Sequence, residues 1–411
     1  MRHVCNRSRR SAPVGTLSAA AVCVFLLASP LLAQTPTRAE EIAKQQEARA
    51  ATAAPDVPSR AERFFEQFEK GKWFVGAPRG WYPAFGSIYD GGGIAGGAGY
   101  RRYIGYDSYV DASAMYSIAN YKQFKLTGST PNHARNRLDL SGTISWVDAT
   151  QVPFFGLGND SDADNRTNFA IQRTQVAGVA DLHLVDWLRL KVDGGLDDYR
   201  QKLGRGAFPS IEILFTPDTA PLLGQHLRYL RGEVSAAALW MPTPAYSRRG
   251  GMARLAYEEF SPQQGGGDTF GIARAEVVQH IPVLRETWVL SLRGRSESVV
   301  RPSDEVPYFL MPWLGSGNTL RGYTTGRFRD RHSLLLTGEL RWFPNRLGFD
   351  MALFYDAGKV APERAGLTLK NMKTDVGVGA RFHTPAATAL RIDLAHGLEG
   401  FRLVFTGSAP F

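Results

Sequence analysis

Apolar and polar residues alternate one by one along much of the chain after residue 80. In residues 334–342 every second position is leucine, glycine or tryptophan, whereas Glu339 and Arg341 fall on the other face. Residues 347–358 repeat the alternation and put Asp356 on the polar face. A period of two predicts pleated strands. An apolar face backed by acids and arginines is typical of a membrane-spanning barrel with a wet interior.

Sixteen segments of this kind follow one another to the last residue. Their expected ranges are 84–90, 93–103, 106–119, 121–128, 137–148, 168–185, 187–201, 227–241, 251–260, 269–281, 287–300, 333–343, 347–358, 374–383, 389–396 and 401–411. No apolar run after Leu32 approaches the roughly 20 residues that a membrane helix needs. Strands can cross a bilayer only as a closed barrel, because every backbone amide must be paired there. We therefore predict an all-β fold, a sixteen-stranded antiparallel transmembrane barrel with both ends on the periplasmic side.

The final segment has the cleanest alternation. Its apolar face carries Phe401, Leu403, Phe405 and Phe411. A barrel strand that ends the chain in an aromatic residue resembles the C-terminal signal recognised by the outer-membrane insertion machinery.

The first 33 residues have the pattern of a secretory signal peptide. Four arginines precede a small and apolar core at residues 14–32, and Ala33 would be the last residue before cleavage. A membrane anchor helix is the alternative, but polar residues and Pro30 interrupt it. We expect residues 34–78 to form a periplasmic linker and residues 79–411 to form the barrel.

The linker contains one short helical pattern, at residues 59–70. Ser59 stands three residues before Glu62, which is capping-box spacing, and three phenylalanines make one apolar side. This helix could dock under the barrel, plug it, or lie on the periplasmic surface.

Charge and cysteine content narrow the classes of partner. The four arginines of the predicted signal peptide account for four units of the formal net charge of +9. The remaining net charge is small for the length of the chain, and the sequence contains no run of five like charges. Both features argue against a nucleic-acid partner. This excess fits a charged lumen or contact with lipid phosphates. Both cysteines, Cys5 and Cys23, precede Ala33, so the mature chain would offer no disulfide and no thiolate ligand.

The sequence predicts no cofactor, no metal site and no catalytic site. The Gly-x-Gly-x-x-Gly spacing of residues 91–96 would need a following helix to bind a dinucleotide, and a glycine-rich strand follows instead. These glycines predict a hairpin turn and a thin first strand. The histidines lack metal-ligand spacing. His280 with Ser291, or His332 with Ser333, could be proposed as a hydrolase pair. Adjacent residues on a strand point to opposite faces, so His332 and Ser333 could not form such a pair.

The long connection, residues 301–332, carries the tetrad Leu320, Arg321, Gly322 and Tyr323 in a stretch rich in glycine and arginine. These residues and the two strands that follow resemble the BamA/TamA-type outer-membrane assembly superfamily, also called the bacterial surface antigen family. Its sixth extracellular loop carries a Val/Leu-Arg-Gly-Phe/Tyr tip, which the tetrad matches.

The resemblance extends to the strands after the loop. The family's thirteenth strand carries Phe-x-Asp-x-Gly, matched by residues 354–358, and its twelfth carries a Gly-Glu step, matched by Gly338 and Glu339. An earlier segment, residues 154–160, is similar to one common in short members. The resemblance covers roughly residues 85–411 and is most specific after Pro312.

The resemblance implies that the sixth loop folds into the barrel and that Arg321 pairs with Asp356, with Glu339 nearby. The rigid fork of an arginine suits a carboxylate, so this loop latch would be structural rather than catalytic. Gly322 would allow a tight turn, and Tyr323 would pack or hydrogen-bond against the inner wall. The alternative is that Arg321 faces solvent, like other arginines of the loop.

The same resemblance implies a bacterial outer-membrane protein that contributes to the assembly of outer-membrane protein or lipid. It would insert or translocate polypeptide, or perturb lipid, at the seam between the first and last strands. Its partners would be outer-membrane lipids, and unfolded outer-membrane polypeptides or a separate periplasmic partner. The linker is too short for the periplasmic POTRA domains of larger relatives, which predicts a barrel-only member. Two alternatives stay open: a passive pore or structural barrel, and, less favoured, an outer-membrane lipid hydrolase.

Overall fold

The computed structural model describes residues 78–407 and Phe411, except 243–246, 266, 285, 302–304, 345–347 and 384–387. The predicted signal peptide, the predicted helix and all but the last residue of the predicted linker lie outside the described residues. No helix of the described part is long and apolar enough to cross a membrane.

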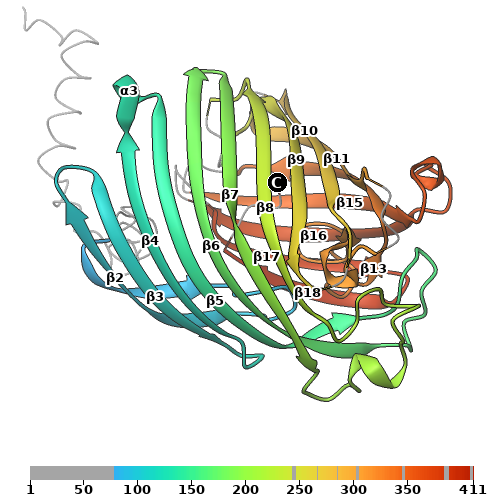
Figure 1. Ribbon diagram of the computed structural model, residues 1–411. Coiled ribbons are helices and arrows are strands. Elements are labelled where there is room, and N and C mark those ends of the chain that lie inside the picture. Colours follow the sequence, from blue (N-terminus) through green and yellow to red (C-terminus); the bar gives the residue numbers. More distant parts are fainter. Residues whose placement is uncertain are drawn as a thin grey trace, which may run out of the picture. The chain divides into compact units, whose positions relative to one another are not determined.

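Sixteen strands form one antiparallel sheet in which each strand pairs with its neighbours in chain order. The strands are β1 (Gly80–Gly86), β2 (Ala95–Ile104), β3 (Ser108–Ser117), β4 (Lys122–Asn132), β5 (Leu138–Phe154), β6 (Thr167–Val185), β7 (Leu188–Leu203), β8 (His226–Leu239), β9 (Gly250–Gln264), β10 (Phe270–Leu284), β11 (Trp288–Val299), β14 (His332–Trp342), β15 (Phe349–Ala361), β16 (Lys373–His383), β17 (Thr388–Gly397) and β18 (Gly400–Thr406). Figure 1 shows this sheet curving into a nearly closed barrel. The prediction of a sixteen-stranded antiparallel barrel is confirmed.

A few short elements lie in the connections. A four-residue helix, α3 (His133–Asn136), joins β4 to β5, and η1 (Ile211–Ile213) lies between β7 and β8. The connection between β11 and β14 contains η2 (Tyr308–Leu310) and a separate hairpin of β12 (Trp313–Leu314) and β13 (Phe328–Arg329). A last short turn, η3 (Arg364–Gly366), follows β15.

The outer face of the wall is apolar. Large apolar side chains are exposed on strand after strand, among them Leu230, Val234, Leu255, Val277, Leu292, Leu353, Val376, Leu394 and Leu403. Exposed apolar side chains at every second residue are the lipid-facing surface of a membrane barrel. The alternation seen in the sequence therefore sets which face meets the bilayer.

The inner face carries charged side chains that pair across neighbouring strands. Arg231 of β8 donates through Nε to Asp197 of β7 at 3.0 Å and through Nη1 to Glu258 of β9 at 3.1 Å. Glu258 also accepts from Arg274 of β10 at 2.5 Å. Each charged group in this set has a partner of opposite charge. Such pairing offsets the free-energy cost of burying a charge.

Apolar side chains form a cluster in the interior at the end of the barrel where the long connections lie. Inward side chains of β5 to β10 pack there against residues of the connections that precede β8 and β14. The Tyr308 ring lies 5.1 Å from Phe154 and 5.0 Å from Phe169, both edge to face. Ile211 and Leu222 complete this packing from the connection before β8. This cluster packs the long connections against the inner wall at that end.

The first strand lies earlier than predicted. We expected residues 84–90, whereas β1 spans Gly80–Gly86 and residues 87–94 connect it to β2. Pro83 lowers the apparent strand propensity, but an edge strand tolerates a proline. Gly91 and Gly93 have φ of 78° and 65°, so they form a turn, as their spacing predicts.

The last strand is shorter than predicted. We expected a strand over residues 401–411, whereas β18 ends at Thr406. Thr406 still pairs with Arg391 of β17, and Phe411 contacts a different part of the wall, as shown below. Alternation alone does not tell where pairing stops when the residues are as small as those of 407–409.

The two edge strands of the sheet are short and lie at its open seam. β1 and β18 have seven residues each, against nineteen in β6. Among the described strands, β1 pairs only with β2 and β18 only with β17. The wall therefore has a seam whose edges carry no strand-to-strand hydrogen bonds in the described residues.

Candidate functional site

The β12–β13 hairpin holds the tip of the long connection in a compact shape. Leu314 of β12 pairs with Phe328 of β13. Within the tip, Tyr323 N donates to the Leu320 carbonyl at 3.2 Å. Leu314, Leu320, Tyr323 and Phe328 pack with Leu335 of β14 in one apolar cluster. The sequence thus folds the tip back on its own base, which fixes where the tetrad projects.

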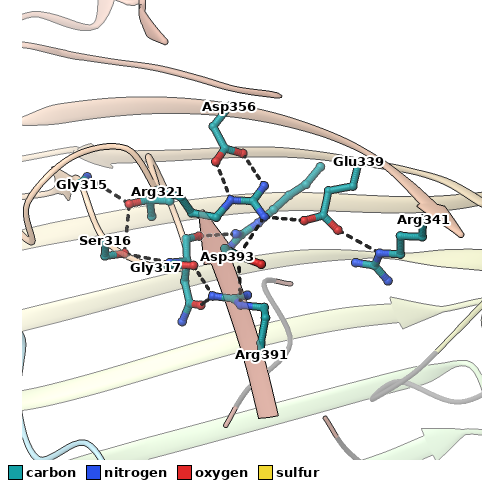
Figure 2. A network of polar contacts seen from close by, with 12 residues as sticks. Gly315, Ser316, Gly317, Arg321, Glu339, Arg341, Asp356, Arg391 and Asp393 are labelled. Carbon is teal, nitrogen blue, oxygen red and sulfur yellow. Dashed lines mark hydrogen bonds and ion pairs between the residues drawn. The ribbon is translucent and has the colours of Figure 1, made fainter. Parts of the chain in front are cut away.

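Arg321 lies at the centre of a buried ion-pair network (Figure 2). Its Nε and Nη2 donate to the two carboxylate oxygens of Asp356 in β15, at 2.7 and 2.9 Å. Its Nη1 donates to Glu339 Oε1 in β14 at 2.6 Å. The guanidinium also lies 3.4 Å from the ring centre of Phe354, and Arg321 is only 1% exposed. The structure places Arg321 against both acids named from the sequence, and away from solvent.

Other charged residues complete the network, and the motif did not point to them. Arg321 Nη1 is 3.3 Å from Asp393 Oδ2 in β17. Glu339 accepts at 2.7 Å from Arg381 Nη2 in β16 and at 2.9 Å from Arg341 Nε in β14. Each of these residues lies on the polar face of an alternating strand. That position was a usable signal, but it does not reveal which strands meet.

A second arginine holds the backbone of the same tip. Arg391 of β17 donates through Nη2 to the Gly317 carbonyl and, at 2.9 Å, to Asn318 Oδ1 (Figure 2). Its Nε is 3.3 Å from Asp393 Oδ2. The two arginines therefore share Asp393, one from the loop and one from the wall.

Gly322 and Tyr323 fit the tip against β16 and the end of β17. A Cβ on Gly322 would lie 2.7 Å from Asp375 Cβ and 2.9 Å from Gly397 N. Close approach to the wall, rather than an unusual backbone angle, requires glycine there. Tyr323 donates through its hydroxyl to the Thr374 carbonyl at 3.1 Å. The tip thus contacts β14, β15, β16 and β17.

Comparisons with known proteins identify the fold family. The family model described as "Omp85 superfamily domain" matches residues 103–399, which include Arg321 and both of its predicted partners. The chain belongs to the Omp85 superfamily. It is accordingly a bacterial outer-membrane protein, and the predicted family and location are confirmed. No curated protein matches the chain.

One solved structure shows the same fold at low sequence identity, and two others are similar to the chain to a lesser degree. BamA from Haemophilus ducreyi lacking POTRA domains 1-3 is 13% identical, with a TM-score of 0.60, and the match covers 80% of this chain and 70% of that one. CdiB from Acinetobacter baumannii is 11% identical (TM-score 0.48, 79% of this chain, 58% of that chain). CdiB from Escherichia coli is 12% identical (TM-score 0.49, 81% and 63%). The chain thus spans less than two thirds of either CdiB chain.

A second arginine of the loop ties this Omp85 barrel's outer connections together. Arg327 donates through Nε to Glu399, in the β17–β18 turn, at 2.5 Å, and through Nη1 to Ser161 Oγ at 2.8 Å. Gly158 N donates to the Arg329 carbonyl at 2.8 Å. Residues 154–160, noted in the sequence for their likeness to short family members, therefore lead directly into the contact with the long loop.

We expect Arg327→Ala to loosen the outer connections without unfolding the barrel. Loss of hydrogen bonds to a charged group costs about 1.5–3 kcal/mol, which would raise the rate of proteolytic cleavage in the loop about tenfold or more. Limited proteolysis of the protein in detergent measures this rate. Arg327→Lys keeps the positive charge but not the forked guanidinium, so its cleavage rate should lie between those of wild type and Arg327→Ala. Equal cleavage rates in Arg327→Ala and wild type would contradict the contact.

One of the two hydrolase pairs considered from the sequence, His280 with Ser291, lies on the inner side of the barrel wall. His280 Nδ1 and Ser291 Oγ are 2.8 Å apart, and both residues are buried on the inner side of the Omp85 wall. A membrane lipid would reach the outer side. Among the described residues no group of His, Cys, Asp or Glu could hold a metal ion.

The residues expected to form a C-terminal signal are divided between two places. Phe401, Leu403 and Phe405 are exposed on β18, with 76%, 55% and 50% of their surface accessible. Phe411 instead contacts side chains of the inner wall. A role of these residues as an insertion signal stays a prediction.

Proposed function

We propose that this Omp85 barrel assembles outer-membrane polypeptide at the seam between β1 and β18. The observation that carries the proposal is the pair of edge strands, β1 and β18, each of which pairs with one neighbouring strand and not with the other edge among the described residues. Unpaired backbone N–H and C=O groups at a sheet edge accept an added strand. A polypeptide that pairs there would be shielded from water and led into the bilayer.

The β1 strand is attached to the wall by its pairing with β2 and by a side-chain contact with β3. In that contact the Tyr82 hydroxyl lies 2.7 and 2.9 Å from the two carboxylate oxygens of Asp111 in β3. Tyr82 crosses Gly99 of β2, where a Cβ would lie 2.2 Å from the tyrosine ring. Glycines weaken a strand because they add no side-chain packing. A thin edge of this kind supports movement at the seam.

The loop latch holds the other side of the seam. The tip contacts β14 through Glu339, β15 through Asp356, β16 through the Thr374 carbonyl and β17 through Asp393. These are four of the last five strands, and the tip's ion pairs do not reach β1 to β4 among the described residues. We infer that the latch keeps the C-terminal strands in register while the N-terminal edge moves.

A passive pore is the alternative. An open pore needs a continuous water path, and a cluster of apolar side chains occupies part of the interior at one end. A separate periplasmic partner and outer-membrane lipids remain proposed partners. No hydrolysis and no cofactor is part of the proposal.

The test compares two activities of the purified protein in liposomes. The rate at which a urea-unfolded outer-membrane barrel becomes folded, followed by heat-modifiable gel migration, should rise well above that of empty liposomes. Ion conductance in planar bilayers should stay low. Steady conductance without any effect on client folding would replace the proposal with the passive pore.

We expect a cross-link across the seam to abolish client folding. Phe85→Cys and Phe401→Cys place single thiols on β1 and β18, near the long-loop ends of both strands, in a chain with no cysteine after residue 23. A flexible, cleavable thiol cross-linker should reduce the folding rate to that of empty liposomes, and cleavage should restore it. A cross-link of the same kind within the wall, between β8 and β9, is the control. Full activity of the cross-linked seam would contradict an opening between β1 and β18.

A further inference from the structure

Charged side chains gather on the outer face of the wall where β7 and β8 reach their long connection. This group, the rim cluster, consists of Asp198, Arg200, His226 and Arg228. The preceding pair of residues on the same face is apolar: Leu196 of β7 lies opposite Leu230 of β8, and they are 43% and 51% exposed. In membrane barrels the long connections lie outside the cell and the short turns in the periplasm. The rim cluster therefore lies at the outer edge of the apolar band.

The side chains of the rim cluster face away from the interior. The residues that alternate with them, Asp197, Tyr199, Leu227 and Tyr229, are buried on the inner side of the wall. By contrast, the side chains of Arg200, Arg228 and His226 are 58%, 40% and 35% exposed. Successive residues of a strand point to opposite faces, so the cluster is presented to the membrane surface and not to the interior.

One carboxylate holds the three basic side chains together. Asp198 Oδ2 accepts from Arg228 Nε at 3.1 Å and from Arg228 Nη2 at 2.9 Å. The same oxygen lies 3.0 Å from His226 Nε2, and Asp198 Oδ1 accepts from Arg200 Nε at 3.3 Å. Two guanidinium groups are thus fixed side by side, which lowers the entropic cost of binding a ligand between them.

The rim cluster has more positive charge than its one carboxylate neutralises. In the described part of the chain, both Nη groups of Arg200 and Nη1 of Arg228 donate to no other residue. Lys202, two residues after Arg200 on the same face, is exposed and adds another positive charge. The residues that pair with the cluster from the flanking strands are uncharged: Gln172 and Thr174 of β6 and Gln264 of β9. An excess of donors and of positive charge at this position suits an anion.

We propose that the rim cluster binds the phosphate group of a lipid in the outer leaflet. Arg200 and Arg228 donate to the phosphate, because a guanidinium offers parallel N–H groups that match phosphate oxygens. Leu196 and Leu230, next to the cluster on the membrane side, contact the acyl chains of the same lipid. The inference names a site for the lipid partner of the proposed function. It concerns β7 and β8, so it can hold or fail independently of assembly at the seam.

Native mass spectrometry of the full-length protein in detergent tests the site, with lipid A that carries both of its phosphate groups as the probe. We expect the double variant Arg200→Ala with Arg228→Ala to bind the probe about tenfold more weakly than wild type, or weaker still, because hydrogen bonds to a charged group are lost. Heat-modifiable gel migration shows whether the variant is folded. Equal binding by the folded double variant and wild type would overturn the proposal.

The matched control is an exposed arginine at the opposite end of the wall. Arg249 precedes β9, is 68% exposed and lies 3.9 Å from Glu286. Arg249→Ala also removes one positive charge from the surface, but it should bind the probe as wild type does. The same loss in Arg249→Ala as in the double variant would show that overall charge, and not the rim cluster, attracts the lipid, and would overturn the proposal.

A second arm varies the ligand and uses the wild-type protein, so it does not depend on the folding of a variant. Lipid A from which both phosphates have been removed should bind about tenfold more weakly than the phosphorylated probe. Inorganic phosphate at the same concentration as the lipid should not displace the probe. Equal binding of the two lipids would show recognition of acyl chains alone, and displacement by inorganic phosphate would show a site for the free ion. Either result would overturn the proposal.

Discussion

Arg321→Ala is expected to lower the free energy of unfolding of the barrel by about 3–5 kcal/mol, because it leaves buried carboxylates without their cation. Asp356, Glu339 and Asp393 all lie within 3.3 Å of the guanidinium, and all three are fully buried. Thermal unfolding in detergent, read by heat-modifiable gel migration, measures the loss. Arg321→Lys should recover only part of it, because an ammonium cannot bind Asp356 with two parallel hydrogen bonds.

The matched control is an arginine of another outer connection. Arg364 is exposed, so Arg364→Ala should change stability little. The network also predicts that exchanging the charges of Arg321 and Asp356 fails to restore stability, since the new carboxylate would face Glu339 and Asp393. An Arg321→Ala protein as stable as wild type would show that the latch does not stabilise the barrel.

Glu339→Gln is expected to destabilise the barrel at least as much as Arg321→Ala. Three guanidinium groups, those of Arg321, Arg341 and Arg381, share this one carboxylate at 2.6–2.9 Å. An amide keeps the size of the side chain but removes the charge, and its nitrogen cannot accept a hydrogen bond. The expected loss is again about 3–5 kcal/mol, measured by the same unfolding assay.

The comparison for Glu339→Gln is a glutamate that lies outside the network. Glu259 of β9 is partly exposed and pairs with Tyr257 and Arg301. Glu259→Gln should cost less than about 1 kcal/mol, as for most surface ion pairs. If the two substitutions had the same effect, the shared carboxylate would not be the centre of the network.

The sequence predicted the strands well because a membrane wall imposes a strict period of two. Lipid on one side and paired charges on the other leave little freedom at each position, as in β14, where Leu336 faces out and Glu339 faces in. The prediction was less accurate at the sheet edges. Pro83 led to a predicted start of the first strand that was too late. The small residues after Thr406 led to a predicted end of the last strand that was too late. Edge strands have fewer partners, so their sequences are less constrained.

The site was predictable only as far as short motifs reach. The tip and the strand motifs pointed to Arg321, Glu339 and Asp356, which the structure brings together. Asp393 and Arg381 lie farther along the chain and enter the network because the barrel curves, which periodicity cannot reveal. The contact of Phe411 with β10 and β11 is likewise set by the curvature of the sheet and by no local pattern.

The central claim, that the seam between β1 and β18 opens for an incoming polypeptide, is tested most directly by a distance measurement. Spin labels on Phe85→Cys and Phe401→Cys, in liposomes, give the distribution of distances across the seam by pulsed electron paramagnetic resonance. The account predicts a longer and broader distribution when unfolded client is added, and no change between a label pair on β8 and β9. A seam distribution that client leaves unchanged, while the client still folds, would contradict it.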